Sequence, residues 1–505
     1  MLEPEEVRPA RPLGRRLLAG VAAGVALLIV ADVLRWMWIG PVPLLGLGRL
    51  LPSGVDLEAE VALGALAFTV AWVGDGGLRR RFGPPAAVAG LTLAALLSNL
   101  GPFPTGDTAP ATFLPFALVR EGRLSFEGTG LDQPLFPLTA EPLPYFLVRS
   151  GERIASKYSP AMGVLATPVY LPAALGHFDA RESEIEHLGK LAAAILAALG
   201  AACVHLASSR LVGQRFAAAA TVLYVLGTPL LSVLGQTLWL HTGAVLGFSV
   251  ALVALTERDA APRNVGLAVG LGVGVALACR PVDVVLAAGF AVALWQVRPR
   301  ALRWMVPAAA IPVLLLAAYQ WRVFGSPLAT GYGAEASEGW TTPVWQGVLG
   351  LLFSPGRGLL LHAPVLLLSI VALARPGRGS SPRWFLPLGL SLLAFLCLMG
   401  HWHSWWGGSS AGNRMLSDGL PILGVALACG LREAWPRRRL RAAVVALAAV
   451  SIATSAALTF AVHEPLWVQV MSVGGEDNPR PWSLGTHPLV ARFRLLFPSS
   501  HGIGR

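Results

Sequence analysis

Long, uninterrupted apolar runs recur along this sequence and limit the folds that it can adopt. Each is about 17–22 residues long, which is enough for a helix to cross roughly 30 Å of hydrocarbon. Hydrophobic residues make up 54% of the 505 residues and charged residues only 13%. No sustained alternation of apolar and polar residues indicates strands. The sequence therefore predicts an all-α polytopic membrane protein.

We predict about 13 transmembrane helices from these runs. They cover residues 17–38, 57–74, 84–101, 187–208, 214–233, 240–256, 264–279, 281–297, 304–320, 359–374, 384–400, 415–431 and 442–462. Arginines cluster in alternate loops, which the positive-inside rule assigns to the cytoplasm. We therefore expect an integral protein of the cytoplasmic membrane with a cytoplasmic N-terminus and an external C-terminus. Because the net charge of +11 serves membrane orientation, no nucleic-acid partner is expected.

One predicted external loop, residues 102–186, is far longer than the other connections. Long loops in compact architectures are uncommon unless they carry a function. Within it, residues 161–174 are apolar but too short to span, and they contain Pro168 and Pro172. We expect this stretch to form a juxtamembrane helix lying in the lipid interface. Any chemistry is therefore expected at the outer membrane surface.

Seven motifs occur in an order known from one group of membrane proteins. They are GDTAPATFLPFALVREGRL, SKYSPAMGVLATPVYL, QTLWLHTGAVL, ACRPVDVVLA, FGSPLATGY, GLLFSPGRGLLLHAPVLL and WWGGSSAGNRMLSDGLP. This series resembles bacterial proteins grouped with the GT-C glycosyltransferases, which include protein O-mannosyltransferases and lipid A aminoarabinose transferase. The resemblance covers residues 84–431 and implies a GT-C-like transmembrane core. Two N-terminal spans, within residues 1–83, precede this core, and residues 432–505 add a last span and a short external tail.

The resemblance also implies an activity. Such enzymes take a sugar from a polyprenyl-phosphate carrier at the outer face of the membrane, and an acid shortly after the first core span acts as general base. Asp107 occupies that place, although it is followed by Thr108 where O-mannosyltransferase-like members commonly carry an Asp-Glu pair. The same residue would also suit an Asx-type turn in a solvated loop. The implied acceptor is an unidentified glycan, lipid or protein.

Four cations are candidate contacts for the donor phosphate. They are Lys157, Arg280, Arg357 and Arg414, each near the expected outer end of a helix. A guanidinium can hold a phosphate through two parallel hydrogen bonds, and helix N-termini also favour anions. Contact with membrane lipid headgroups is the alternative for Lys157 and Arg357. Pairing with Asp283 is the alternative for Arg280.

Aromatic and histidine side chains near the same helix ends are candidate substrate-lining residues. They are Tyr158, His241, His401, Trp402, His403, Trp405 and Trp406. Tryptophan rings stack on sugars but also form belts at the membrane interface, so both interpretations stay open. Two histidines two residues apart lack a third ligand, so no metal site is predicted, although a divalent cofactor is not excluded.

Two other classes of function compete with a transferase. One is a flippase or transporter of lipid-linked sugar, for which inverted repeats and ionisable residues near mid-span are expected. Asp32 is the only acid well within a predicted span, and no repeat is evident. The other is a catalytically inactive relative. The sequence has no P-loop and no nucleophile-elbow serine, which argues against ATP-driven transport and serine hydrolase chemistry.

Overall fold

A computed structural model of the chain describes residues 13–39, 55–134, 136–178, 181–460 and 481–496. Within these residues, the secondary structure is helical apart from one short β-hairpin. In the part of the chain that the structure describes, six helical segments are long and apolar enough to cross a membrane. They are Leu18–Trp38, Leu57–Gly74, Ser183–Val212, Pro262–Cys279, Pro299–Phe324 and Arg438–Phe460. The prediction of a helical protein with several helices able to span a membrane is therefore confirmed.

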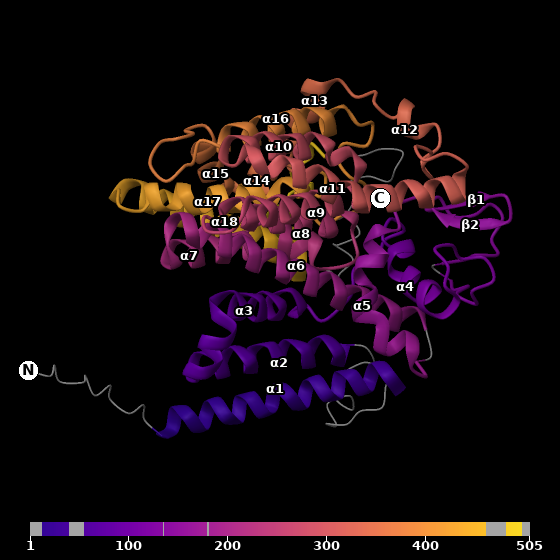
Figure 1. Cartoon of the computed structure of the whole chain (residues 1–505), viewed down its shortest axis with the longest axis horizontal. Coiled ribbons are helices and arrows are strands. Elements are labelled where there is room, and N and C mark those ends of the chain that lie inside the picture. The colour runs from indigo at the N-terminus through magenta and orange to yellow at the C-terminus, as the bar shows by residue number, and fades with distance from the viewer. Residues whose placement is uncertain (1–12, 40–54, 135, 179–180, 461–480, 497–505) are drawn as a thin grey trace, which may run out of the picture.

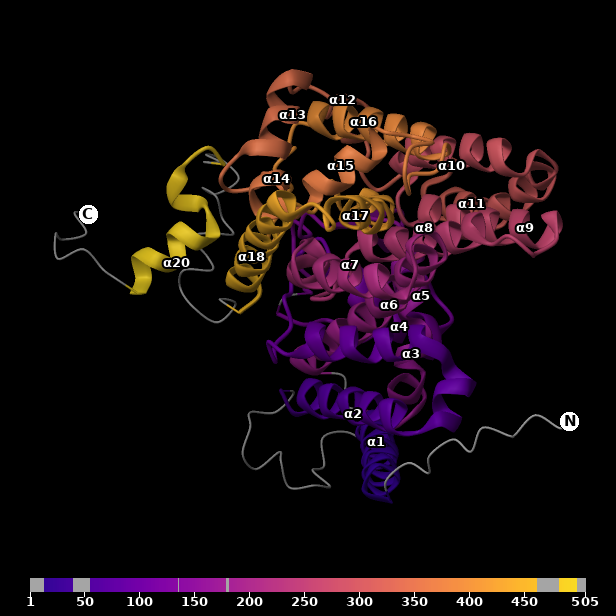
Figure 2. The ribbon, with the colours of Figure 1, turned by 90° about the vertical axis from the view of Figure 1, so that its left-hand side faces the viewer.

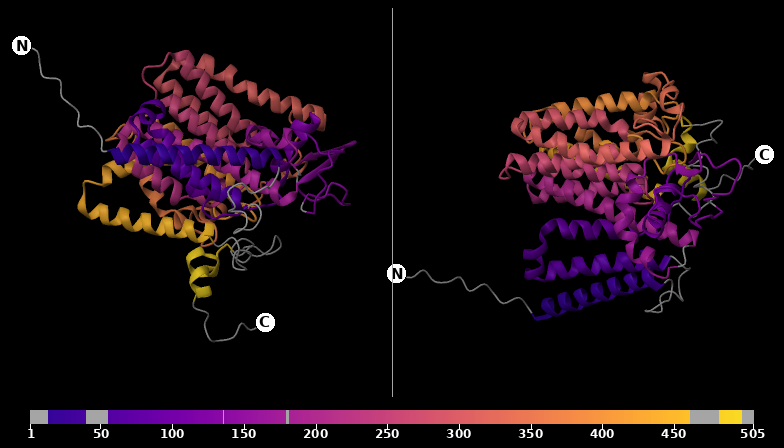
Figure 3. Two further views of the ribbon diagram at one scale, coloured as in Figure 1. Left: turned by 90° about the horizontal axis from the view of Figure 1, so that it is seen from below. Right: turned by 45° about the vertical axis from the view of Figure 1, so that its right-hand side comes forward.

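The helices of the main bundle lie side by side (Figure 1). They are α1 (Leu13–Ile39), α2 (Val55–Gly74), α3 (Gly76–Leu97), α6 (Glu182–Val212), α7 (Gln214–Leu226), α8 (Leu240–Thr256), α9 (Pro262–Cys279), α10 (Val284–Val297), α11 (Leu302–Phe324), α16 (Phe385–His401), α17 (Leu420–Ala434) and α18 (Arg438–Phe460). Helices α1 to α3 form a layer along one side of this bundle (Figures 2 and 3). Large apolar side chains cover the outer faces of the bundle. Leu28 on α1 is 65% exposed, and Leu315 on α11 is 69% exposed. Such surfaces are characteristic of contact with lipid.

The predicted count of about 13 transmembrane helices is not confirmed, because several predicted spans correspond to shorter helices. The run at 214–233 stops being α-helical at Leu226, and a π-helical turn, Leu230–Leu234, follows Pro229. The run at 359–374 is split into α14 (Leu359–His362), a 3-10 turn and α15 (Leu367–Leu373). Proline lacks the N–H that a continuous helix needs, and Pro364 stands at this break.

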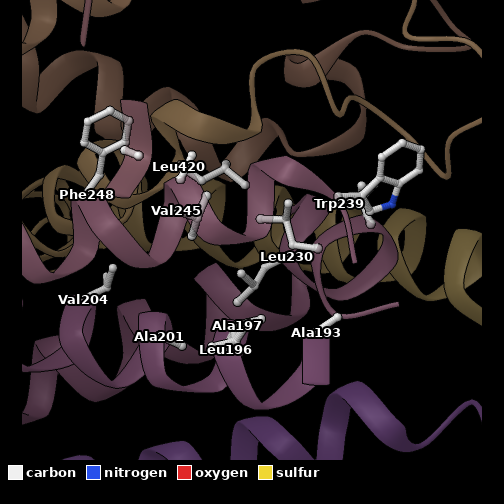
Figure 4. Close-up of a cluster of buried hydrophobic side chains, with 14 of the residues drawn as sticks. Ala193, Leu196, Ala197, Ala201, Val204, Leu230, Trp239, Val245, Phe248 and Leu420 are labelled. Atoms are coloured by element: carbon white, nitrogen blue, oxygen red, sulfur yellow. The ribbon is translucent and has the colours of Figure 1, made fainter. Parts of the chain in front are cut away.

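Small residues bring the central helices close together. Along α6, Ala193, Ala197 and Ala201 are buried against α8 and η2, the π-helical turn (Figure 4). On α8, Val245 and Phe248 fill part of the same core. Close backbone approach through small side chains is the usual way in which membrane helices pack. This packing fixes the helix ends relative to one another.

Short elements gather at one end of the bundle (Figure 1). They are α4 (Ala109–Glu121), α5 (Ala161–Leu175), strands β1 (Leu147–Ser150) and β2 (Arg153–Ser156), and α12 (Glu335–Glu338). Helix α5 coincides with the juxtamembrane helix predicted over residues 161–174. The antiparallel hairpin was not predicted, because its four-residue strands are too short to show an alternating pattern. Two further helices are α13 (Val344–Phe353) and α20 (Pro488–Leu496), which packs on α18 (Figure 2).

Candidate active site

A cavity with a volume of about 1010 Å³ lies where the short elements meet the helix ends. Its wall combines the segments before α4, α5 and α8, the ends of α9, α11 and α16, and the chain around α12. Five of its lining residues carry a charge. They are Asp107, Lys157, Arg280, Glu335 and Arg414. The cavity therefore brings together residues as far apart in the sequence as Asp107 and Arg414.

Asp107 is bound by three side chains in the cavity wall. Its Oδ2 atom is 2.6 Å from Nη1 of Arg414. Its Oδ1 atom accepts hydrogen bonds from the hydroxyls of Tyr158, at 2.5 Å, and Tyr145, at 2.9 Å. The neighbouring Thr108, not Asp107, makes the local turn contacts, because its hydroxyl donates to the carbonyl of Thr105. The carboxylate thus faces the cavity and does not form the Asx-type turn considered from the sequence.

These contacts determine the charge state of Asp107. Burial raises the pKa of this carboxyl, but the positive charge of Arg414 and the two tyrosine hydrogen bonds lower it by more. The net pKa is below that of an ordinary aspartate, so the group is ionised at neutral pH. Burial also raises the pKa of Tyr332, on the same wall, to about 12, and the negative charge of Asp107 adds to this effect. Burial and the same negative charge also raise the pKa of Tyr158, so its hydroxyl remains protonated and able to donate to Asp107.

Gly106 makes room for the hydroxyl that reaches Asp107. A Cβ atom at this position would lie 2.6 Å from the Tyr145 hydroxyl and 2.7 Å from a ring carbon of Phe146. Carbon atoms do not approach this closely without displacement of a neighbour. A glycine is therefore required before Asp107 if Tyr145 is to keep its place.

Arg414 is held by a glycine turn and an aromatic ring. Its Nε donates to the Gly407 carbonyl at 2.6 Å, and its guanidinium lies 4.4 Å from the centre of the Trp239 ring. Gly407 and Gly408 have φ angles of 76° and 57°, which glycine adopts without steric cost. The turn at Gly407 and Gly408 thus brings the backbone against the side chain of Arg414. Its planar group is aimed at the cavity.

Arg280 belongs to a second charged cluster. It contacts the fully buried carboxylate of Asp418 and also lies 2.6 Å from Nδ1 of His241. That same Nδ1 is 2.9 Å from Asp418 Oδ1, so the ring can bond only one of the two partners at a time in a given tautomer. The ion-pair partner of Arg280 is Asp418 and not Asp283, which was the alternative considered from the sequence. The sequence analysis did not identify Asp418, which lies 138 positions away.

Lys157 is already paired within the cavity wall. Its Nζ atom is 2.6 Å from Glu335 Oε2, on α12, and 5.0 Å from the centre of the Tyr332 ring. His403 Nε2 approaches the other oxygen of Glu335 at 3.3 Å. Glu335 was also absent from the predicted site, because only the fold brings α12 next to the segment before α5.

The structure divides the other predicted site residues into two groups. Tyr158, His241, Trp402 and His403 line the cavity. Outside its lining lie Arg357, His401, Trp405 and Trp406. Arg357 is fully buried, and its guanidinium donates to the carbonyls of Trp406, Gly356 and Gly408 at 2.9–3.0 Å. Arg357 therefore supports the loop that carries Gly407, whereas the sequence analysis placed it at the donor phosphate.

His401 and Trp405 also make structural contacts. The Nδ1 atom of His401 is 2.7 Å from the carbonyl oxygen of Thr342, which joins the end of α16 to the segment before α13. Trp405 is buried against Gly350 of α13. Among the residues that the structure describes, no three His, Cys, Asp or Glu side chains come close enough to hold a metal ion.

Two crystal structures are similar to this chain. Both are of ArnT from Cupriavidus metallidurans. The structure bound to undecaprenyl phosphate is 15% identical, with a TM-score of 0.46 over 81% of this chain and 74% of that chain. The apo structure is 15% identical, with a TM-score of 0.47 over 83% and 76%. Neither similarity identifies a family or a substrate for this chain.

Comparisons of sequence give no match. No protein-family model matches the chain, and no curated protein matches it. The arrangement of side chains around the cavity is therefore the basis on which a function can be argued.

Proposed function

We propose that this protein is a membrane glycosyltransferase that moves a sugar from a polyprenyl-phosphate donor to an acceptor at the outer face of the cytoplasmic membrane. The observation that carries this proposal is the convergence of Asp107, Arg280 and Arg414 on one cavity. A carboxylate able to take a proton thus shares a cavity with two cations able to receive a phosphate.

The cavity suits an amphiphilic donor. Apolar side chains such as Phe103, Leu316 and Met399 line it together with the charged residues. Ligand sites are commonly of this kind, mostly apolar with a few placed polar groups. The apolar lining would accept the start of a lipid chain, and the cations would receive the phosphate.

In the proposed reaction, Asp107 accepts the proton of an acceptor hydroxyl or amine. The acceptor atom attacks the anomeric carbon, and the bond from that carbon to the phosphate oxygen breaks. The phosphate leaves with the bonding electrons, and Arg280 and Arg414 stabilise the charge that develops on it. Fixed charges aimed at a developing anion usually contribute the largest share of rate enhancement.

The contact between Arg414 and Asp107 indicates how the base would be activated. While the pair is intact, the pKa of Asp107 is lowered, and the carboxylate is a weak base. A donor phosphate that attracts Arg414 would leave Oδ2 of Asp107 without its ion-pair partner and raise the pKa of this carboxyl. The two tyrosine hydroxyls would still donate to Oδ1. The donor would thus switch on the base as it binds.

The decisive test is transfer by purified protein in liposomes from a panel of polyprenyl-phosphate sugars, comparing wild type with Asp107→Asn. We expect transfer to fall by about 10²- to 10⁴-fold in the variant. Glu141→Gln is the matched control, because Glu141 is an exposed acid of the same segment that pairs with Arg149 outside the cavity. Full activity of Asp107→Asn would contradict the base assignment. Flipping of the donor without transfer would favour a transporter.

A further inference from the structure

The two lysines of this chain occupy unusual places. The sequence contains 39 lysines and arginines, of which only Lys157 and Lys190 are lysines. Lys157 lines the cavity, whereas Lys190 is fully buried within α6, outside it. An ionisable residue inside a membrane span is costly and usually has a specific role. The mechanism proposed above gives Lys190 none.

Lys190 holds the two sides of a strained turn. Its Nζ atom donates to the side-chain carbonyl of Asn99 at 2.6 Å and to the backbone carbonyl of Gly101 at 2.5 Å. Between these two acceptors lies Leu100, with a φ of 50°. It is the only non-glycine residue with positive φ in the described part of the chain. Such a conformation persists only when the surrounding structure enforces it.

The turn is the first part of the segment that leads to Asp107. It follows α3, and residues 101–108 run from it to the start of α4. The end of this segment next to α4 is also held in place, because the Thr237 hydroxyl donates a hydrogen bond to the Thr108 hydroxyl at 3.1 Å. The segment that carries the proposed base is thus fixed at both ends.

The two fixed ends are joined through one side chain. Asn99 donates from its amide to Gln236 Oε1 at 2.8 Å, and Gln236 precedes Thr237 in the chain. Gln236 in turn donates to the carbonyl of Leu231 at 2.7 Å. Lys190 therefore belongs to a buried network, joined through Asn99, that connects α6, the turn after α3 and the segment before α8.

An ammonium fits this place better than a guanidinium. It is a compact charge with three donors that can point in different directions, whereas a guanidinium is a planar fork. The two acceptors of Lys190 are neutral oxygens on either side of one residue. A compact donor can reach both without displacing the turn.

We propose that Lys190 is a positioning residue, which holds Leu100 in its left-handed conformation and thereby sets the place of Asp107 in the cavity. The consequence for catalysis rests on the proposed function. The consequence for the backbone of residues 99–108 does not, and it can be measured separately.

The first experiment is amide hydrogen exchange of the full chain in nanodiscs, comparing wild type with Lys190→Met. We expect the amides of Thr108 and Ala109, which bond to the Thr105 carbonyl, to exchange about 10-fold faster in the variant, since release of the turn allows local opening. Ser98→Ala is the matched control, because the exposed Ser98 hydroxyl donates only to the Ala95 carbonyl within α3. Exchange at the wild-type rate in a folded Lys190→Met protein would overturn the proposal.

A second experiment separates positioning from general packing. Glycine adopts positive φ without strain, so Leu100→Gly added to Lys190→Met should restore at least half of the lost protection. A variant that merely loosened the bundle would not be rescued by glycine at this turn. If Lys190→Met does not fold, Asn99→Ala removes one acceptor without touching the charge and should give the same change. Failure of rescue in the double variant would count against the proposal.

The third measurement is turnover. Misplacement of a reacting group by about 1 Å can cost up to about 100-fold in rate, so kcat of Lys190→Met should fall by about 10- to 100-fold with an unchanged KM for the donor. A raised KM with unchanged kcat would contradict a positioning role. If wild type transfers no sugar, the proposed function fails, but the exchange results still decide the role of Lys190.

Discussion

Arg414 Nη1 lies 2.6 Å from Asp107 Oδ2, so the proposed base and a proposed phosphate ligand neutralise one another in the cavity wall. Because this pair lowers the pKa of Asp107, its effects depend on pH in a defined direction. The pair contributes to stability above the ordinary aspartate pKa, and the contribution is lost as the pH falls through the lowered value.

Replacement of Arg414 by glutamine should raise the pKa of Asp107, because the largest lowering influence is removed. In the wild type, the acid limb of kcat/KM against pH should lie below the ordinary aspartate range, about 3.9. In Arg414→Gln that limb should move to higher pH, and the donor KM should rise. The measurement is the pH profile of transfer for both proteins. Superimposable acid limbs would show that Arg414 does not control this titration.

Tyr158 and Tyr145 should contribute unequally to the rate of transfer. Tyr158→Phe removes the shorter, more buried hydrogen bond to Asp107, and Tyr145→Phe removes the longer one, at 2.9 Å. Hydrogen bonds to charged groups contribute about 1.5–3 kcal/mol. We expect Tyr158→Phe to lower transfer by about 10-fold or more, and Tyr145→Phe to lower it by less. Parallel kcat measurements test the order, and the reverse order would argue against this geometry.

Alanine at position 106 should act through Tyr145. The new Cβ atom would lie 2.6 Å from the tyrosine hydroxyl and push it away from Asp107. We expect transfer by Gly106→Ala to be no higher than that of Tyr145→Phe. Gly20→Ala is a suitable control, because a Cβ atom at Gly20 meets nothing within 4 Å. Wild-type transfer by Gly106→Ala would mean that Tyr145 does not serve the carboxylate.

Replacement of Arg357 should lower thermal stability, whereas replacement of Arg280 should weaken binding of the donor. Arg357→Met leaves carbonyl oxygens of the 406–408 loop without a donor, so the thermal midpoint should fall, by the equivalent of about 2–5 kcal/mol. Arg280→Lys keeps the charge beside Asp418 but loses the planar fork, so the donor KM should rise with little change in the midpoint. Thermal unfolding together with donor titration distinguishes them. An unchanged midpoint in Arg357→Met would contradict its structural role.

The apolar runs predicted where helices lie, because length and hydropathy are local properties. They failed where Pro229 and Pro364 end α-helical structure inside an apolar run, since hydropathy carries no information about the missing N–H. For the site, position at the expected outer end of a span, together with the family resemblance for Asp107, selected Asp107, Arg280 and Arg414, which line one cavity.

The predicted site was incomplete for a different reason. Asp418 and Glu335 meet their cationic partners only through tertiary packing, so no local spacing reveals them. Arg357 was assigned to the donor because a buried arginine bound by carbonyls and an exposed one look the same in sequence. Arg414 contacts Gly407, seven positions away in the chain, but its aromatic partner, Trp239, is brought to it only by the fold.

The cations of the cavity already have anionic partners, with Lys157 beside Glu335, Arg280 beside Asp418 and Arg414 beside Asp107. Three positive and three negative groups leave little net field to draw an anion in from solution. Association with a charged substrate should therefore depend only weakly on ionic strength. A ligand would be recognised by how well it replaces those partners, so selection among anions would occur inside the cavity and not during diffusion towards it.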